Sequence, residues 1–170
     1  YTDTHMADDV YESITERESG GKPSRRYSFL EHVWTFDVTA GATVTFFVEA
    51  HHSANSEGDD FVFAYSTDDV NYTDLVTVTK TSDDNQAQSA LLPASLSGTG
   101  SLRVLDSDQS QGNRALDTVF VDRIFIRTTP SSGDVTPPAA PTNLFAAPVD
   151  PMNIYLDWDD NTEDDLAFYN

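Results

Sequence analysis

The loop from Asp106 to Asp117 carries the residues of this sequence that are best suited to chemistry. It reads DSDQSQGNRALD, so Asp106 and Asp108 are separated by one residue and Asp117 closes the segment. Alternate carboxylates in a turning loop converge on one point, and Ca²⁺ takes about six to eight oxygen ligands from such loops. The segment is not an EF-hand, because its glycine falls one place late and no Glu closes it. The sequence predicts calcium bound by Asp106, Asp108 and Asp117, with a solvated acidic turn as the alternative.

Two other groups invite a metal interpretation but support it less well. The first is made of two acidic pairs, Asp59–Asp60 and Asp83–Asp84. The second is Glu49 with the two histidines that follow it, His51 and His52. Adjacent residues of a strand point to opposite faces, so only Glu49 and His51 could share an ion. Zinc catalysis needs at least one more ligand and a base, so we interpret these histidines as the end of a strand.

Exposed aromatic side chains are the second kind of candidate, because their faces stack on sugar rings beside amide and carboxylate acceptors. The candidate ligand-binding residues are Phe47, Tyr65, Tyr72 and Phe125, with Asn71 and Arg123 nearby. Trp34 lies on an apolar strand face and Trp158 belongs to the C-terminal segment, so we expect both to be core residues. The aromatic set predicts binding of a polysaccharide or a cell-surface glycan.

Nothing in the sequence predicts catalysis. Paired carboxylates could be chosen almost anywhere in a chain with 29 acidic residues, so such a pair does not indicate glycoside hydrolysis. Serines, histidines and aspartates are present, but none lies in the context of a nucleophile elbow or a catalytic triad. We therefore predict that the chain is not an enzyme.

Charge and composition restrict the partners. The net charge is −20, from nine basic and 29 acidic residues, and such a surface repels nucleic acid and anionic lipid. No apolar run approaches the roughly 20 residues that span a bilayer, so we expect no membrane insertion. The chain has no cysteine, which excludes disulfides and thiolate zinc sites. It begins at Tyr1 and stops in mid-pattern at Asn170, so we interpret it as a piece of a longer protein whose neighbouring domains are among its partners.

Strand-length runs with period-two alternation fill the first 129 residues. Val10–Glu18, Tyr27–Val38 and Thr43–Ala50 alternate apolar and polar residues, and the last two are joined by the short sequence TAGA. We predict that these two strands form an antiparallel hairpin, with Gly41 supplying a positive φ in the turn.

A second hairpin is predicted further along the chain. Phe61–Ser66 and Asp74–Thr79 flank a segment rich in Asp and Asn, which favour turns. Further strands are expected at Ala87–Leu92, Ser101–Leu105 and Thr118–Arg127. About eight short strands with no convincing helix predict an all-β fold, an antiparallel β-sandwich of the jelly-roll type.

The C-terminal part follows a different pattern. Residues 130–141 are rich in Pro, Ser and Gly and are predicted to be a linker. Beyond it, PAAPTNL and IYLDWDDN resemble the first and second strands of a fibronectin type III domain, with DLAFYN at the start of the third. The resemblance implies that Trp158 is the buried second-strand tryptophan. Residues 142–170 cover only about a third of such a domain, so we expect this truncated segment to be extended or loosely packed.

The first 129 residues resemble the β-sandwich accessory modules of secreted bacterial enzymes. The pattern rests on VTAGATVT at Val38–Thr45 and on the last strand VDRIFI. The resemblance includes galactose-binding-like carbohydrate-binding modules, in which acids of the first and last strands often hold a structural calcium. It implies that Glu12 and Asp122 are metal ligands. We therefore predict a non-catalytic, extracellular or cell-surface binding module with structural calcium, and the alternative is an architectural or adhesive spacer without a ligand site.

Overall fold

The computed structural model describes residues 4, 6–55, 57–131, 140, 142–150 and 153–159. The chain divides into two compact units, with the boundary between Ser131 and Ser132. Most of the predicted linker at 130–141, and the predicted third strand DLAFYN, lie outside the described residues, so the predicted domain boundaries stay predictions. Within the described residues, no helix has the length and apolar character that a membrane span requires.

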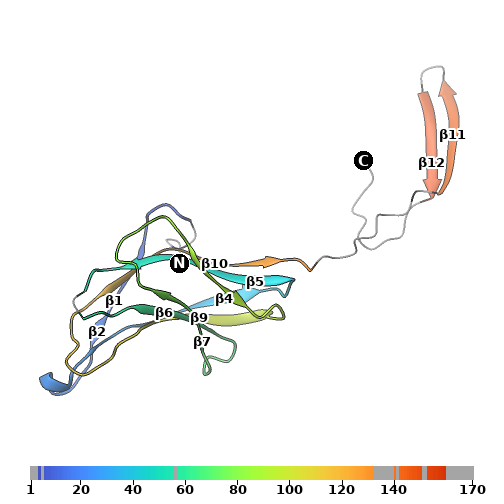
Figure 1. Ribbon diagram of the computed structural model, residues 1–170. Coiled ribbons are helices and arrows are strands. Elements are labelled where there is room, and N and C mark those ends of the chain that lie inside the picture. The colour runs from blue at the N-terminus through green and yellow to red at the C-terminus, as the bar shows by residue number, and fades with distance from the viewer. Residues whose placement is uncertain are drawn as a thin grey trace. The chain divides into compact units, whose positions relative to one another are not determined.

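The first unit is built from two four-stranded antiparallel sheets (Figure 1). The sheet that we name the β5 sheet has the order β1 (Glu12–Thr15), β10 (Thr118–Thr129), β5 (Thr43–His52), β8 (Gln88–Leu92). The sheet that we name the β9 sheet has the order β4 (Glu31–Val38), β9 (Gly98–Asp106), β6 (Phe61–Ser66), β7 (Thr73–Val78). This strand order is that of a jelly roll, so the predicted all-β, jelly-roll sandwich is confirmed.

Three short elements complete this unit. Strands β2 (Arg17–Glu18) and β3 (Ser28–Phe29) pair with each other. Between them lies η1 (Pro23–Arg25), a single 3₁₀ turn and the one helical element in the described part of the chain. The predicted strand at Val10–Glu18 is therefore two strands, with buried Glu16 between them.

The core lies between the inner faces of the two sheets. Alternate residues of β5, Val44, Phe46 and Val48, are fully buried, as period-two strands require. Phe46 meets Phe63 of the β9 sheet, with ring centroids 6.0 Å apart. Trp34 of the same sheet stacks on Phe63 at 5.9 Å. Burying each of these large side chains contributes about 1.5–3 kcal/mol. The prediction that Trp34 is a core residue is confirmed.

The two predicted hairpins have different outcomes. Strands β6 and β7 pair directly, with Phe61 opposite Val78 and Tyr65 opposite Thr73, so the predicted hairpin around the TDDVNYT turn is confirmed. The hairpin predicted between β4 and β5 is wrong. Strand β4 pairs with β9, and β5 pairs with β10 and β8, so the connection crosses from one sheet to the other. Both strands bury an apolar face, and a sandwich satisfies both by placing them in opposite layers.

The role predicted for Gly41 is also wrong. Gly41 is not among the residues with positive φ. It is required for space, because a Cβ there would lie 2.2 Å from the backbone oxygen of Thr129 and 2.5 Å from Cγ2 of Thr128. The β4–β5 connection thus packs directly on the end of β10, which fixes how the two sheets are joined.

The second unit contains an antiparallel pair, β11 (Thr142–Asp150) and β12 (Asn153–Asp159). Large apolar side chains of this pair are exposed, including Leu144, Phe145 and Ile154. Trp158 is half-buried rather than buried, which corrects the expectation from the fibronectin resemblance. The described residues of this unit form one two-stranded layer, which by itself cannot enclose a tryptophan.

The close approach at Gly41 gives the first testable prediction. Gly41→Ala forces the β4–β5 connection away from β10, and we expect it to lower the free energy of unfolding by about 1–3 kcal/mol. The matched control is Gly20→Ala, because a Cβ at Gly20 meets nothing within 4 Å. Surface changes of that kind stay within about 0.5 kcal/mol. Urea unfolding of both variants measures the difference, and equal stabilities would contradict the packing role.

Candidate functional site

Jelly-roll connectivity brings five acidic or amide side chains to one end of the sandwich. In antiparallel neighbours, the C-terminal end of one strand lies beside the N-terminal end of the next. Strands β1 and β9 therefore end where β10 and β6 begin. Glu16 follows β1 and Asp117 precedes β10, while Asp59 precedes β6 and Asp106 ends β9. Together with Asn113, they form what we name the end cluster.

The centre of the end cluster is a group of three buried carboxylates. Glu16, Asp59 and Asp117 each offer one oxygen, and these oxygens all lie within 4.8 Å of one another. Each carboxylate also has one oxygen held in place. The Asp117 backbone N–H donates to Glu16 Oε2 at 2.9 Å, Ser53 Oγ donates to Asp117 Oδ1 at 3.0 Å, and Asn113 Nδ2 donates to Asp59 Oδ1 at 2.8 Å. The second oxygens are thereby fixed in direction.

Within the described residues, no N–H or O–H group outside the cluster donates a hydrogen bond to those second oxygens. They are Glu16 Oε1, Asp59 Oδ2 and Asp117 Oδ2, together with Asp106 Oδ2 and Asn113 Oδ1. Asp59 is only 1% exposed and Glu16 only 3%. An unpaired buried polar atom costs about 1–3 kcal/mol, and more when it is charged. Five such atoms in one place are expected where a ligand supplies the missing partner.

The electrostatics of the end cluster are those of crowded carboxylates without a cation. Burial raises the pKa of Glu16 to about 7, and repulsion from Asp106 acts in the same direction. Burial likewise raises the pKa values of Asp59 and Asp106, although hydrogen bonds from Asn113 and from the Asp108 backbone oppose the shifts. None of the ion pairs among the described residues includes a member of the cluster. A bound divalent cation would supply the opposite charge.

Of the three carboxylates predicted in the acidic loop, two join the end cluster. Asp106 and Asp117 are buried members, whereas Asp108 is partly exposed and organises the turn. Its Oδ1 accepts from the Ser110 backbone N–H at 2.8 Å and its Oδ2 from Asn113 Nδ2 at 3.2 Å, which lowers its pKa. Asp108 therefore orients Asn113 toward Asp59.

Glu12 and Asp122, named from the family resemblance, lie outside the end cluster. Glu12 of β1 is paired with Val121, the residue that precedes Asp122 in β10. Glu12 Oε2 accepts from the Trp34 indole N–H at 3.0 Å, and its Oε1 lies 3.3 Å from His32 Nε2. Its role is to satisfy the indole of a core residue. Asp122 instead lies under the N-terminal segment, where the Asp8 backbone N–H donates to its Oδ1 at 3.3 Å. Different partners hold the two carboxylates, and their role as metal ligands stays a prediction.

The residues of the two acidic pairs, Asp59–Asp60 and Asp83–Asp84, have different partners in the structure. Asp60 lies 3.6 Å from His52 Nε2, and Asp84 forms an ion pair with Lys80 at 2.7 Å. Asp83 accepts from the Tyr11 hydroxyl at 3.0 Å. Asp59 is the one member of these acidic pairs that belongs to the end cluster. The sequence marks the GDD loop as acidic, but residue types alone do not distinguish Asp59 from the adjacent Asp60.

The four predicted aromatic residues do not form one platform. Phe47 and Phe125 lie opposite each other on β5 and β10, with ring centroids 4.8 Å apart and planes 7° from parallel. Two arginines of β10 cover them, Arg123 at 4.4 Å from the Phe125 centroid and Arg127 at 5.1 Å from that of Phe47. We name this group the Phe–Arg face.

Tyr65 and Tyr72 belong to the other sheet. Tyr65 is half-buried and packs against the core from β6. Tyr72 lies before β7 and carries the Arg103 guanidinium 3.7 Å above its ring, so that face of the ring is already covered. Neither tyrosine is near the Phe–Arg face, because they come from the β9 sheet.

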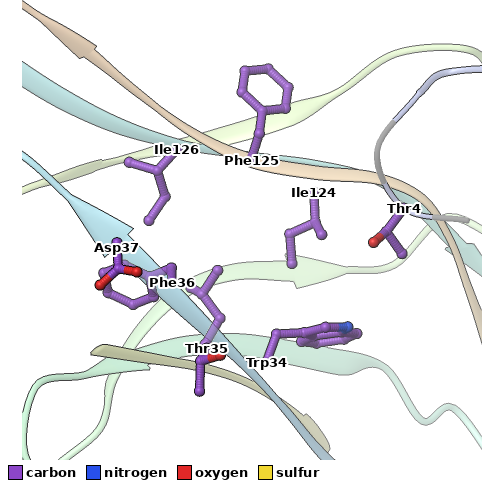
Figure 2. Close-up of a pocket in the computed structure, with 9 residues that line it drawn as sticks. Thr4, Trp34, Thr35, Phe36, Asp37, Ile124, Phe125 and Ile126 are labelled. Atoms are coloured by element: carbon purple, nitrogen blue, oxygen red, sulfur yellow. The ribbon is translucent and has the colours of Figure 1, made fainter. Parts of the chain in front are cut away.

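A cavity of about 190 Å³ opens between the sheets, beside β4 and β10. Figure 2 shows Ile124 and Ile126 directed toward Trp34 and Phe36, with Phe125 directed away from them. Asp37 is the one titratable side chain in its lining. The volume is below the roughly 300–1,000 Å³ of typical ligand pockets. The cavity is a small gap of mixed polar and apolar lining, and it does not include the end cluster.

Fold and site together define a class: an antiparallel jelly-roll β-sandwich with a buried carboxylate cluster at one end. No protein-family model matches the sequence, and no curated protein matches it. Among solved structures, the chain is similar to the carbohydrate-binding module TmCBM61, determined in complex with β-1,4-galactotriose. The sequences are 13% identical, the TM-score is 0.42, and the match covers 75% of this chain and 92% of that one.

Sequence reasoning missed Glu16 and Asn113 as members of the cluster. Glu16 was placed inside a strand, on the same side as Ile14. The signal that could have found it is the break in that strand: a charged residue in the interval between two strand segments is free to turn toward the sandwich end. Asn113 follows Gly112, which has positive φ, so its orientation depends on a turn that residue types alone did not specify.

The raised pKa of Glu16 predicts an unusual pH dependence. Between its ordinary value of 4.5 and its folded value of about 7, the folded state binds a proton that the unfolded chain does not. Stability of the metal-free protein therefore increases as the pH falls through 7 toward 5. Denaturant unfolding in chelator over this range measures the slope, and Glu16→Gln reduces it. If the free energy of unfolding of the metal-free protein decreases as the pH falls from 7 to 5, the raised pKa of Glu16 is contradicted.

Proposed function

We propose that this chain is a non-catalytic accessory module whose jelly roll is held together by one structural calcium ion in the end cluster. The single observation that carries the proposal is the set of five buried oxygens without partners, from Glu16, Asp59, Asp106, Asn113 and Asp117. All five are hard oxygen ligands, which suit Ca²⁺, and no nitrogen or sulfur ligand that would favour zinc is among them.

The ligands come from both layers of the sandwich. Glu16 and Asp117 belong to segments that continue into β1 and β10 of the β5 sheet. Asp59 precedes β6 and Asp106 ends β9, and both of these strands belong to the β9 sheet. A cation at this point joins the two sheets, and without it the same carboxylates repel each other across the interface. In a chain without cysteine, such an ion performs the role that a disulfide has elsewhere.

Calcium is therefore expected to stabilise the protein strongly. An ion that binds only the folded state contributes about 2.7 kcal/mol when its concentration is 100 times the dissociation constant. We expect the midpoint of thermal unfolding to rise by several degrees in calcium relative to chelator, with a smaller response to magnesium at equal ionic strength. Differential scanning calorimetry of the full chain measures the shift.

Variants of the end cluster should distinguish loss of calcium binding from loss of folding. Asp59→Asn keeps an acceptor for Asn113 but removes a charge, so we expect it to abolish the calcium response while leaving the metal-free protein as stable or more stable. Asp74→Asn is the matched control, since Asp74 is an exposed residue of β7. Loss of the calcium response in the control as well, or its persistence in Asp59→Asn, would count against the end cluster.

The second proposed function is binding of a polysaccharide or cell-surface glycan on the Phe–Arg face. The supporting observation is that two arginines and two aromatic rings gather on one face of a strongly acidic protein. Guanidinium groups donate to sugar hydroxyls and carboxylates, and ring edges provide apolar contact. We propose that the parent protein is extracellular or at the cell surface and that the second unit begins a fibronectin type III domain.

Glycan binding is tested by a screen that includes β-1,4-galactotriose and acidic polysaccharides. If the Phe–Arg face is the site, Phe125→Ala and Arg127→Ala each weaken retention in affinity electrophoresis at least several-fold. Tyr72→Ala is the matched control from the opposite sheet. Retention that survives both changes, or absence of any retention with calcium present, would favour the architectural spacer over the binding module.

A further inference from the structure

The Phe–Arg face lies on the outer side of the β5 sheet and continues onto a third strand. In the register of the sheet, Thr45 of β5 lies between Arg127 of β10 and Leu91 of β8. The residues before and after Thr45 are fully buried in the core, so Thr45 and its cross-strand partners point outward. Leu91 is 74% exposed. The face therefore offers an apolar side chain beside its arginines to a ligand from solvent.

The aromatic rings of this face are already in contact with protein groups. Phe47 and Phe125 stack on each other with ring centroids 4.8 Å apart. The Arg123 guanidinium lies over the Phe125 ring at 4.4 Å, and that of Arg127 lies 5.6 Å from the same centroid. Both phenylalanines are half-buried. Little of the aromatic surface is left for stacking on a neutral sugar, whereas the two guanidinium groups converge above one ring.

The arginines of the face have no acidic partner of their own. Acidic residues outnumber basic ones by 29 to nine, yet among the described residues neither of these two arginines forms an ion pair. The Arg and Lys residues that do form ion pairs there are Arg26, Lys80, Arg103 and Arg114. Nε of Arg123 is also buried, and no acceptor in the described part of the chain bonds to it. A buried charged donor without an acceptor is costly, so it is expected where a ligand supplies the acceptor.

Acids near Arg123 leave the charge of Arg127 available. Arg123 lies opposite Glu49 and lowers its pKa, although burial and the charge of Asp122 raise it. Asp122 precedes Arg123 at the register shift in β10 and is 1% exposed, so it faces away from an approaching ligand. Arg127 is exposed and lies opposite the uncharged Thr45. An anionic group therefore meets Arg127 first and the buried Nε of Arg123 beside it.

We propose that the Phe–Arg face binds a glycan through the carboxylates of uronic acids, and not by stacking on neutral sugars. This inference rests on the proposed glycan-binding function and specifies the class of its ligand. A guanidinium presents its N–H donors in a planar fork that fits both oxygens of a carboxylate. The phenylalanine rings hold these forks in orientation, which reduces the entropy lost on binding. Leu91 provides contact for the apolar side of an adjoining sugar.

The net charge of −20 determines which probe is suitable. The acidic surface repels a polyanion at a distance, and at 0.15 M ionic strength salt screens that repulsion beyond about 8 Å. A guanidinium and a carboxylate in direct contact are screened much less. A short oligosaccharide with few carboxylates is therefore a better probe than a long polyanion.

The test compares two forms of one ligand, trigalacturonate and its methyl ester. The ester keeps the sugar rings and hydroxyls but carries no charge. Isothermal titration of the full chain, with calcium present, is expected to show that the free acid binds about tenfold more tightly, because charge-assisted hydrogen bonds are about twice as strong as neutral ones. β-1,4-Galactotriose is the neutral reference, and a sulfated galactotriose distinguishes a carboxylate from any other oxyanion.

Variants assign the preference to the arginines. Arg127→Gln removes the charge and the fork, so we expect it to weaken binding of the free acid about tenfold and to leave the ester unchanged. Arg127→Lys keeps the charge without the fork and is expected to give an intermediate affinity. Arg25→Gln is the matched control, because Arg25 is an exposed residue of η1 and its loss changes the net charge equally. Circular dichroism confirms that each variant is folded.

The outcomes separate the ligand class from the function on which it rests. Equal binding of acid and ester, with both lost in Phe125→Ala, overturns the carboxylate preference and keeps glycan binding on this face. Free-acid binding that survives Arg127→Gln, or that falls equally in Arg25→Gln, also overturns it. Sulfated galactotriose bound as tightly as trigalacturonate replaces the carboxylate by any oxyanion and overturns the inference as stated. Absence of binding by all four oligosaccharides overturns the glycan-binding function itself.

Discussion

The structure of the first unit depends on how it holds buried negative charge. A carboxylate removed from water is costly unless an opposite charge or several hydrogen-bond donors replace the lost hydration. In the end cluster, donors from Ser53, Asn113 and the Asp117 backbone satisfy one oxygen of each central carboxylate and leave the other free. That half-satisfied arrangement fixes the carboxylates in orientation without neutralising them. It resembles a prepared coordination shell more than a network that is stable by itself, because a half-satisfied polar network is less favourable than an apolar one of the same shape.

The jelly-roll connectivity explains why the charge gathers at one end. Apart from the β6–β7 hairpin, consecutive strands of the two large sheets lie in opposite layers, so loops at the same end of the sandwich bring together residues that are distant in sequence. Glu16 and Asp117 are 101 residues apart, yet they are joined by hydrogen bonds in both directions. Asp59 and Asn113 are 54 residues apart and share one hydrogen bond. Contacts of such long range cost loop-closure entropy during folding. The apolar core, with Phe46 and Phe63 between the sheets, provides the free energy that brings these loops together.

Strands and tight turns could be predicted from neighbouring residues in the sequence, whereas strand pairing and the full end cluster could not. Alternation within β5, β6 and β10 predicted strands and a sandwich, and the β6–β7 hairpin was predicted because its turn residues are adjacent. The failed β4–β5 hairpin has equally good local signals, but pairing is decided by which layer each apolar face must cover. In the same way Asp106 and Asp117 were predicted from one loop, whereas Glu16 and Asn113 were not. Their positions depend on a break in β1 and on a turn after Gly112, which become meaningful only once the strands are assembled.

The two carboxylate groups have different mechanical consequences for the module. The end cluster draws ligands from segments of both sheets, so an ion there would resist separation of the layers. Asp122 and Glu49 belong to neighbouring strands that are already hydrogen-bonded, so their charges oppose each other within one sheet and not across the sandwich. The N-terminal segment around Asp8 and Asp9 covers Asp122, and it meets β10 again where the Ile124 N–H donates to the Thr4 carbonyl at 3.0 Å. That segment lies beside β10 next to Arg123, whose guanidinium belongs to the Phe–Arg face. Arg123 lowers the pKa of Glu49, so the same arginine that covers Phe125 also offsets part of the negative charge beside the N-terminal segment.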